Sequence, residues 1–138
     1  MSRGVTLLEL LVVLAILGLI LGGSYALYAP TYRLGAASAE LRALLQAART
    51  EAIRRGTLTT VRLGGEELSL EVQNQVLGRF SPTHYGAKLT GPANLVLNAL
   101  GRPVEERVSS YTLSLGNRKR TLCVEVGGRV REVTGDGC

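Results

Sequence analysis

The chain has 138 residues, of which 16 are Lys or Arg and 11 are Asp or Glu, so its formal net charge is +5. This length leaves room for one modest hydrophobic core and excludes a multidomain enzyme. A hydrophobic fraction of 46% and a charged fraction of 20% also exclude a disordered tail and a polytopic membrane protein. The charges are unevenly placed, because residues 5–29 contain one acidic residue, Glu9, and no basic residue.

Residues 5–29 predict a membrane-spanning helix. At about 1.5 Å per residue, the apolar run after Glu9 reaches across the hydrocarbon core of a bilayer. A cleaved secretory signal is the main alternative, but its apolar region is usually shorter and ends at a small-x-small site. The very short leader before the run indicates that the N-terminus stays in the cytoplasm and that the following residues face outward. At Gly22-Gly23 and Pro30 we expect the helix to bend or to melt locally.

Residues 30–56 predict an amphipathic continuation of this helix. Apolar residues recur at steps of three and four, and the charged residues fall largely between them. We expect the helix to end at Gly56, after Arg54 and Arg55. The positive charges of these two arginines suit the negative end of the helix dipole, although a role in binding a partner is an equal alternative.

Residues 57–138 predict a β-rich head, because the apolar period changes to two from Thr57 onward. Gly64-Gly65-Glu66 is expected to join two strands in a hairpin. The stretch 81–92 is expected to be a loop. Further strands are expected at 74–80, 94–98, 110–115, 120–126 and 129–134, with turns at Gly116-Asn117-Arg118-Lys119 and at Gly127-Gly128. The sequence therefore predicts an α+β protein, a long N-terminal helix followed by an antiparallel sheet.

Cys123 and Cys138 are too few for a zinc site of four ligands, and His84 is the only His. A disulfide between the two cysteines is the favoured interpretation, and two free thiols are the alternative. The bridge would close a loop around the last predicted hairpin, for which the chain-entropy estimate is about 3 kcal/mol. We expect no metal and no cofactor.

An enzyme is not expected from this inventory of side chains. The sequence has no Gly-x-Ser-x-Gly elbow, no phosphate-binding glycine loop and no cluster of metal ligands. The nearest arrangement is Ser81 with His84, which lacks an acid to complete it.

The string Arg3-Gly4-Val5-Thr6-Leu7-Leu8-Glu9-Leu10 resembles the start of type IV pilins and pseudopilins. The resemblance implies that a prepilin peptidase removes residues 1–4 by cutting between Gly4 and Val5, and that the new amine of Val5 is then methylated. Glu9 would become the fifth mature residue, whose carboxylate neutralises the N-terminal amine of a neighbouring subunit in the filament. The residues alone also allow Glu9 to be a side chain that reaches the membrane interface. Val5 departs from the family, which most often has Phe at this position.

Three further stretches resemble the family of H-type pseudopilins and fimbrial T minor pilins. They are Ala47–Gly56, Leu95–Pro103 and Val126–Arg131. The resemblance implies a long helix packed on an antiparallel sheet head, and other pilins or pseudopilins as partners. It also implies one span in the inner membrane, with the head in the periplasm before the subunit enters a type IV pilus or a type II secretion pseudopilus.

Gly128, Arg129 and Arg131 match the Gly-Arg-x-Arg motif that the fimbrial T branch is thought to use for binding DNA during uptake. Arginines two residues apart on a strand project to one face, where their guanidinium groups can engage the phosphates of double-stranded DNA without reading its sequence. Alternatively, these arginines protect a sheet edge or pair with Glu125 and Glu132.

The basic turn Arg118-Lys119-Arg120 is expected either to add cations to this surface or to be an ordinary solvated turn. Two functions stay open: a minor pilin that binds DNA in natural transformation, and a structural pseudopilin of type II secretion without DNA binding. A membrane-anchored binding module that never polymerises is a third class.

Overall fold

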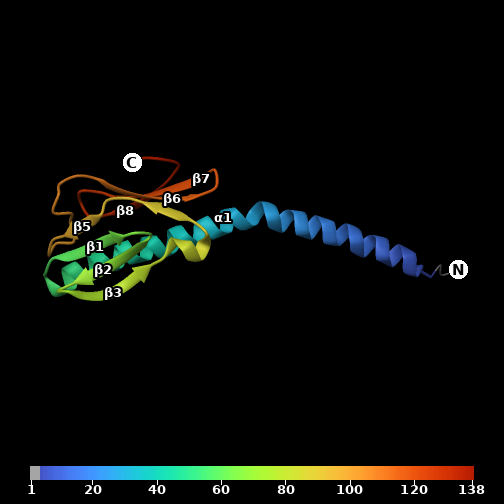
Figure 1. The fold of residues 1–138 in the computed structure, drawn as a ribbon, viewed down its shortest axis with the longest axis horizontal. Helices are drawn as coiled ribbons and strands as arrows, with labels where there is room; N and C mark the ends of the chain where they lie inside the picture. The colour runs from blue at the N-terminus through green and yellow to red at the C-terminus, as the bar shows by residue number, and fades with distance from the viewer. Residues whose placement is uncertain (1–3) are drawn as a thin grey trace. The chain divides into compact units, whose positions relative to one another are not determined.

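The computed structural model describes residues 4–138, so Arg3 of the predicted leader lies outside the described residues. The chain divides into two compact units, Met1–Tyr32 and Arg33–Cys138. The helix α1 (Leu7–Arg55) contributes to both (Figure 1). It is continuous through Gly22-Gly23 and Pro30, so the expectation of local melting is wrong. Pro30 removes only one backbone donor, and breaking the helix there would leave further backbone amides unpaired.

Local side chains explain both ends of α1. The amide of Glu9 donates a hydrogen bond to Oγ1 of Thr6 at 3.3 Å, which makes Thr6 the residue that caps the helix. Thr6 and Glu9 have the Thr-x-x-Glu spacing that is typical of helix starts. At the other end, Gly56 takes a φ of +61°, and the helix ends before it, as the sequence predicts.

The unit Arg33–Cys138 contains eight strands and one short 3-10 helix. They are β1 (Thr59–Gly64), β2 (Glu67–Val72), β3 (Gln75–Phe80), η1 (Pro82–Tyr85), β4 (Lys88–Thr90), β5 (Asn94–Leu97), β6 (Ser109–Leu115), β7 (Arg118–Val124) and β8 (Val130–Thr134). The stretch 81–92 was expected to be a loop, but it holds η1 and β4. The strand expected at 120–126 begins earlier, at Arg118, so Gly116-Asn117 alone forms the turn before it.

The strands form two antiparallel sheets of four strands each. One has the order β3-β2-β1-β5 and the other has the order β4-β6-β7-β8. The hairpin expected at Gly64-Gly65-Glu66 is confirmed, because β1 and β2 pair up to Gly64 and Glu67. The chain enters the second sheet with β4 and returns to the first with β5, so neither sheet is one continuous stretch of the sequence.

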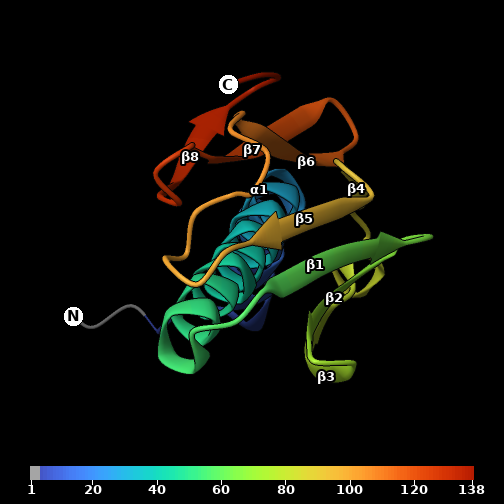
Figure 2. The same ribbon diagram turned by 90° about the vertical axis from the view of Figure 1, so that its left-hand side faces the viewer.

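Both sheets pack on the C-terminal part of α1 around one hydrophobic core, shown end-on in Figure 2. The helix contributes a stripe of small and large apolar residues at the predicted spacing. Its fully or nearly fully buried members are Leu34, Ala37, Leu41, Leu45, Ala48 and Ala52. From the sheets, Phe80, Tyr111 and Leu122 have no exposed surface. The predicted fold class, a long N-terminal helix packed on an antiparallel β-rich head, is therefore confirmed.

Candidate nucleic-acid interface

The Gly-Arg-x-Arg motif lies at the turn between β7 and β8. The amide of Gly128 donates to the carbonyl of Glu125 at 2.7 Å, and the amide of Glu125 donates to the carbonyl of Arg129 at 2.9 Å. Gly128 has a φ of +82°, which side chains other than glycine rarely adopt. A turn followed by one residue of positive φ is a common three-residue connection of hairpins. Arg129 therefore directly follows the turn, and Arg131 lies two residues further on, in β8.

Arg129 and Arg131 converge on one carboxylate. Their Nε atoms lie 3.6 Å and 3.3 Å from the two carboxylate oxygens of Glu125. The side chains of Arg129 and Arg131 are 79% and 53% exposed. Such solvent-exposed pairs contribute little to stability, and two guanidinium groups on one carboxylate leave a positive charge at this surface. Glu132, the other expected partner, instead pairs with Arg120 at 2.7 Å.

Gly128 is needed for close approach as well as for its backbone angle. A Cβ atom at this position would lie 2.0 Å from the carbonyl oxygen of Gly101. Gly101 itself has a φ of +71°, and a Cβ there would lie 2.7 Å from Cγ of Arg49 on α1. The Arg49 side chain, Gly101 and Gly128 therefore stack on one another, and we call this arrangement the glycine stack. It fixes the hairpin turn against the loop after β5 and against α1.

Asn98 shapes the loop that carries Gly101. Its Oδ1 accepts hydrogen bonds from the amides of Leu100 and Arg102 at 3.0 and 3.1 Å. Its backbone amide donates to the carbonyl of Arg102, and its carbonyl accepts from the amide of Gly101, both at 2.8 Å. An Asn side chain that satisfies amides two and four residues ahead closes a tight loop. The Leu95–Pro103 stretch thus meets the Gly-Arg-x-Arg turn in space, which the sequence does not indicate.

Two cations of the basic stretch at the start of β7 are paired with carboxylates. Lys119 pairs with Asp136 at 2.8 Å, and Arg120 pairs with Glu132. At the end of α1, Arg54 and Arg55 both pair with Glu51 at 2.8 Å. Hydrogen bonds from these arginines, Arg54 first, lower the pKa of the Glu51 carboxyl, and the pKa of Arg54 is raised in return. Lys119 and Arg120 therefore each have a carboxylate of their own, whereas Arg54 and Arg55 share one, and the Arg55 side chain is only 29% exposed.

A disulfide joins Cys123 to Cys138, with their Cα atoms 5.8 Å apart. Cys123 lies fully buried in β7, whereas Cys138 is exposed. Because β8 lies between them in the sequence and pairs with β7, the bridge ties the segment after β8 back to the same sheet. The strand that carries Arg131 is thus held at both ends, by the glycine stack and by the disulfide.

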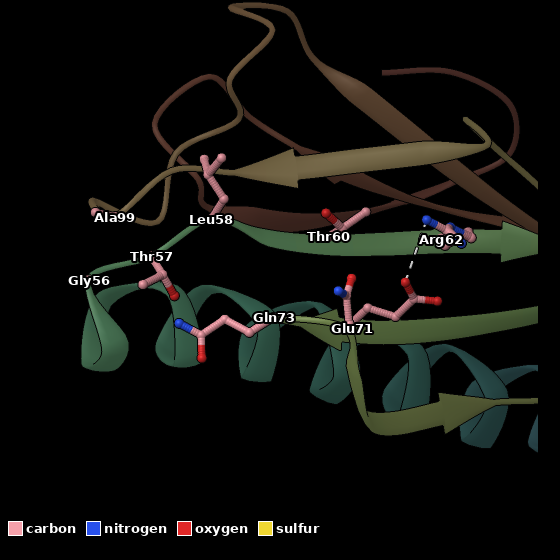
Figure 3. Close-up of a pocket in the computed structure, with 9 residues that line it drawn as sticks. Gly56, Thr57, Leu58, Thr60, Arg62, Glu71, Gln73 and Ala99 are labelled. Carbon is pink, nitrogen blue, oxygen red and sulfur yellow. Dashed lines mark ion pairs between the residues drawn. The ribbon is translucent and has the colours of Figure 1, made fainter.

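A cleft of about 610 Å³ lies on the sheet that contains β1 to β3 and β5, over β1 and the end of β2 (Figure 3). Its lining includes Thr57, Gln73 and the pair Arg62 and Glu71, whose charged atoms are 3.6 Å apart. Since the one cation in this lining faces a carboxylate, the cleft does not offer an anion site comparable with the hairpin.

The Ser81 and His84 pair does not form a catalytic arrangement. The hydroxyl of Ser81 bonds to the hydroxyl of Thr83 at 2.7 Å, and the His84 side chain is exposed on η1. Among residues 4–138, no group of three or more His, Cys, Asp or Glu side chains is placed to hold a metal ion.

The N-terminal part of α1 is long and apolar enough to cross a membrane, with a mean hydropathy of 2.5 over its most apolar window. None of that window is buried within the described residues. Gly4 and Val5 precede the helix, and Glu9 lies in its first turn. The surface of this segment is therefore suited to lipid or to other apolar helices.

Comparison with known proteins identifies the family of this chain. Residues 37–128 match the family described as "Type II transport protein GspH", and residues 1–25 match the "Prokaryotic N-terminal methylation motif". The chain belongs to the GspH family. It is 30% identical over 151 aligned residues to the pilin-like protein PilA1 of Thermus thermophilus, covering 94% of this chain and 97% of that protein.

The fold is also that of the type IV minor pilin FimU of Pseudomonas aeruginosa. Two crystal forms of FimU superpose with TM-scores of 0.62 and 0.64 at 21% identity. They cover 73% and 76% of this chain and 88% and 99% of the FimU chains. GspH-family chains with a methylation motif and this fold are structural subunits of the minor pilin and pseudopilin class, not enzymes.

Proposed function

We propose that this GspH-family chain is a minor type IV pilin that binds double-stranded DNA through its β7–β8 hairpin during natural transformation. The observation that carries the proposal is the pair of exposed guanidinium groups, Arg129 and Arg131, which share the single carboxylate of Glu125. Guanidinium groups bind phosphate oxygens in a bidentate manner, so this surface suits a nucleic-acid backbone. Gly128 contributes by fixing the turn that presents both arginines.

The aromatic residues of Arg33–Cys138 favour duplex DNA over a single strand. Proteins that bind single strands commonly stack the bases on exposed aromatic rings. Here Phe80 and Tyr111 are buried, and the hydroxyl of Tyr85 donates to the carboxylate of Glu40. Contacts of arginine with phosphate carry no sequence information, so binding is expected to be sequence-independent. One hairpin offers few contacts, and retention of DNA would depend on several subunits in a filament.

The N-terminal residues supply the processing and assembly part of the proposal. A prepilin peptidase cuts between Gly4 and Val5, the amine of Val5 is methylated, and Glu9 neutralises the amine of a neighbouring subunit. The methylation motif and the apolar surface of α1 support this sequence of events. The head then faces the periplasm, with the chain anchored in the inner membrane before it joins other pilins. Glu9→Ala should abolish incorporation into filaments while leaving the chain in the membrane fraction, and normal incorporation would refute this role.

DNA binding is best tested by fluorescence anisotropy with the oxidised full chain in a non-ionic detergent and a short labelled duplex. The test variant is Arg129→Ala/Arg131→Ala. The matched control is Arg62→Ala/Arg79→Ala, because these two arginines are similarly exposed, at 58% and 62%, and also face carboxylates at 3.6 and 3.7 Å. We expect the hairpin variant alone to lower the slope of log affinity against log salt by about 1.8, for two lost phosphate contacts.

The second candidate function is that of a structural pseudopilin in type II secretion, without DNA binding. The observation that favours it is the family description, a type II transport protein, over residues 37–128. In that case the wild-type chain does not bind the duplex even at low salt, and deletion of the gene impairs secretion rather than transformation.

A further inference from the structure

A surface groove of about 520 Å³ borders the hairpin on the side of α1. Its wall is formed by Gly128, Arg129 and Val130, and its floor by one face of the helix that carries Arg42, Gln46 and Arg49. These helix residues are four and three positions apart, a spacing that places them on the same side of a helix. Three arginines therefore line the groove, and no carboxylate does.

Two of these arginines lack a partner in the described part of the chain. Neither Arg42 nor Arg49 forms an ion pair or a side-chain hydrogen bond with any of residues 4–138, unlike the paired arginines of the hairpin and of the helix end. The Nε atom of Arg49 is buried and has no acceptor. Because this Nε atom is buried, an acceptor in the groove must contact the other nitrogen atoms of the Arg49 guanidinium group, whose charge no carboxylate of residues 4–138 neutralises.

We propose that the groove is an anion site for the phosphates of a DNA backbone, and that Arg42 and Arg49 extend the interface from the hairpin onto α1. This inference rests on the proposed DNA-binding function. Arg129 lines the groove and also faces Glu125 beside Arg131, so a DNA strand that contacts the motif passes the mouth of the groove.

The spacing of the helix arginines fits a nucleic-acid backbone. Arg42 and Arg49 are separated by seven residues, which is about 10 Å along a helix. One strand of B-DNA carries a phosphate every 3.4 Å or so along its axis, so three steps cover about the same distance. The site therefore accommodates phosphates of one strand, with Arg129 adding a third cation.

The decisive variant is Arg42→Gln, because Arg42 is exposed and its loss does not disturb the core. Titrations of a short labelled duplex use the oxidised full chain in a non-ionic detergent, between about 50 and 200 mM NaCl. We expect a roughly two- to fivefold loss of affinity and a salt slope lower by about 0.9. Arg79→Gln on β3 removes the same charge far from the groove in the fold and should change neither quantity.

Arg49 needs a second variant, because its side chain packs on Gly101. Arg49→Lys keeps the charge but lacks the planar fork that binds phosphate in a bidentate manner, and it should also weaken binding. An Arg42→Gln chain that behaves like Arg79→Gln, while Arg129→Ala/Arg131→Ala loses binding, overturns the groove and leaves the hairpin function standing. A wild-type chain that does not bind duplex DNA at low salt overturns both.

Discussion

Replacing Gly128 with Ala tests the glycine stack directly. The new Cβ would lie 2.0 Å from the carbonyl oxygen of Gly101, and its residue would keep a φ of +82°. The backbone angle costs about 1–2 kcal/mol for a residue with a side chain. The overlap adds about 1–3 kcal/mol, because the atom that must move is backbone rather than the end of a flexible side chain. We therefore expect the free energy of unfolding to fall by about 2–5 kcal/mol.

The assay is urea unfolding of the oxidised fragment 33–138, which contains every buried side chain among the described residues. Two other glycines separate the two contributions. Gly127→Ala meets no atom within 4 Å and has no positive φ, so it should leave stability unchanged or slightly raised. Gly56→Ala also meets no atom within 4 Å but has a φ of +61°, so it should show the backbone cost alone. A Gly128→Ala midpoint no lower than that of Gly56→Ala would refute the close contact with Gly101.

Three further predictions concern the bridge, the core and the hairpin. Cys138→Ser should lower the free energy of unfolding by about 3 kcal/mol. Because Cys138 is exposed, the wild-type chain in reductant should show the same loss. Equal stability of the oxidised and reduced chains would contradict a stabilising role of the bridge. Burial raises the pKa of the Tyr111 hydroxyl, so the folded state holds this proton more tightly than the unfolded state; the stability it provides is complete below about pH 10 and is lost as the pH rises further. Since that hydroxyl has no hydrogen-bond partner, Tyr111→Phe should leave stability at pH 7 unchanged or raise it. The variant should also lose less stability than the wild type above about pH 10, and urea midpoints at pH 7 and above pH 10 would show this. Glu125→Gln removes the carboxylate that Arg129 and Arg131 share, so duplex affinity should rise roughly two- to fivefold, and a lower affinity would count against phosphate binding at the hairpin.

The spacing of apolar residues and turn residues predicted most helices and strands, because most of these elements are determined by residues close together in the sequence. Alternation of apolar residues located β1 and β2, and two adjacent glycines located their turn. The three residues of β4 were missed, since their strand character comes from pairing with β6 more than twenty positions later. Continuity of α1 through Pro30 was also missed, because a single lost hydrogen bond is outweighed by those of its neighbours.

The candidate site could be predicted in its residues but not in its surroundings. Arg129 and Arg131 follow from the motif, but their shared contact with Glu125 does not, because Glu132, the other expected partner, pairs with Arg120. The contact of Gly101 with Gly128, and the position of Arg49 beside them, join three segments that are far apart in the sequence. The only local signal was that Arg49 adjoins Ala48 in the buried stripe of the helix, a common position for an ordinary surface arginine.

The order in which the chain visits the two sheets affects how the β-rich head folds, because β4 belongs to the second sheet and β5 to the first. β4 is made before its partner β6 and before the other strands of its sheet, and β5 must return to a sheet whose other three strands have already been made. During synthesis, the edge of β1 therefore stays open until β5 has been made, and β4 stays unpaired until β6 follows. Exposed strand edges are the usual starting points of aggregation. Completion of both sheets consequently depends on residues 94–138, and any pause in synthesis before residue 94 would leave both sheets unfinished at once.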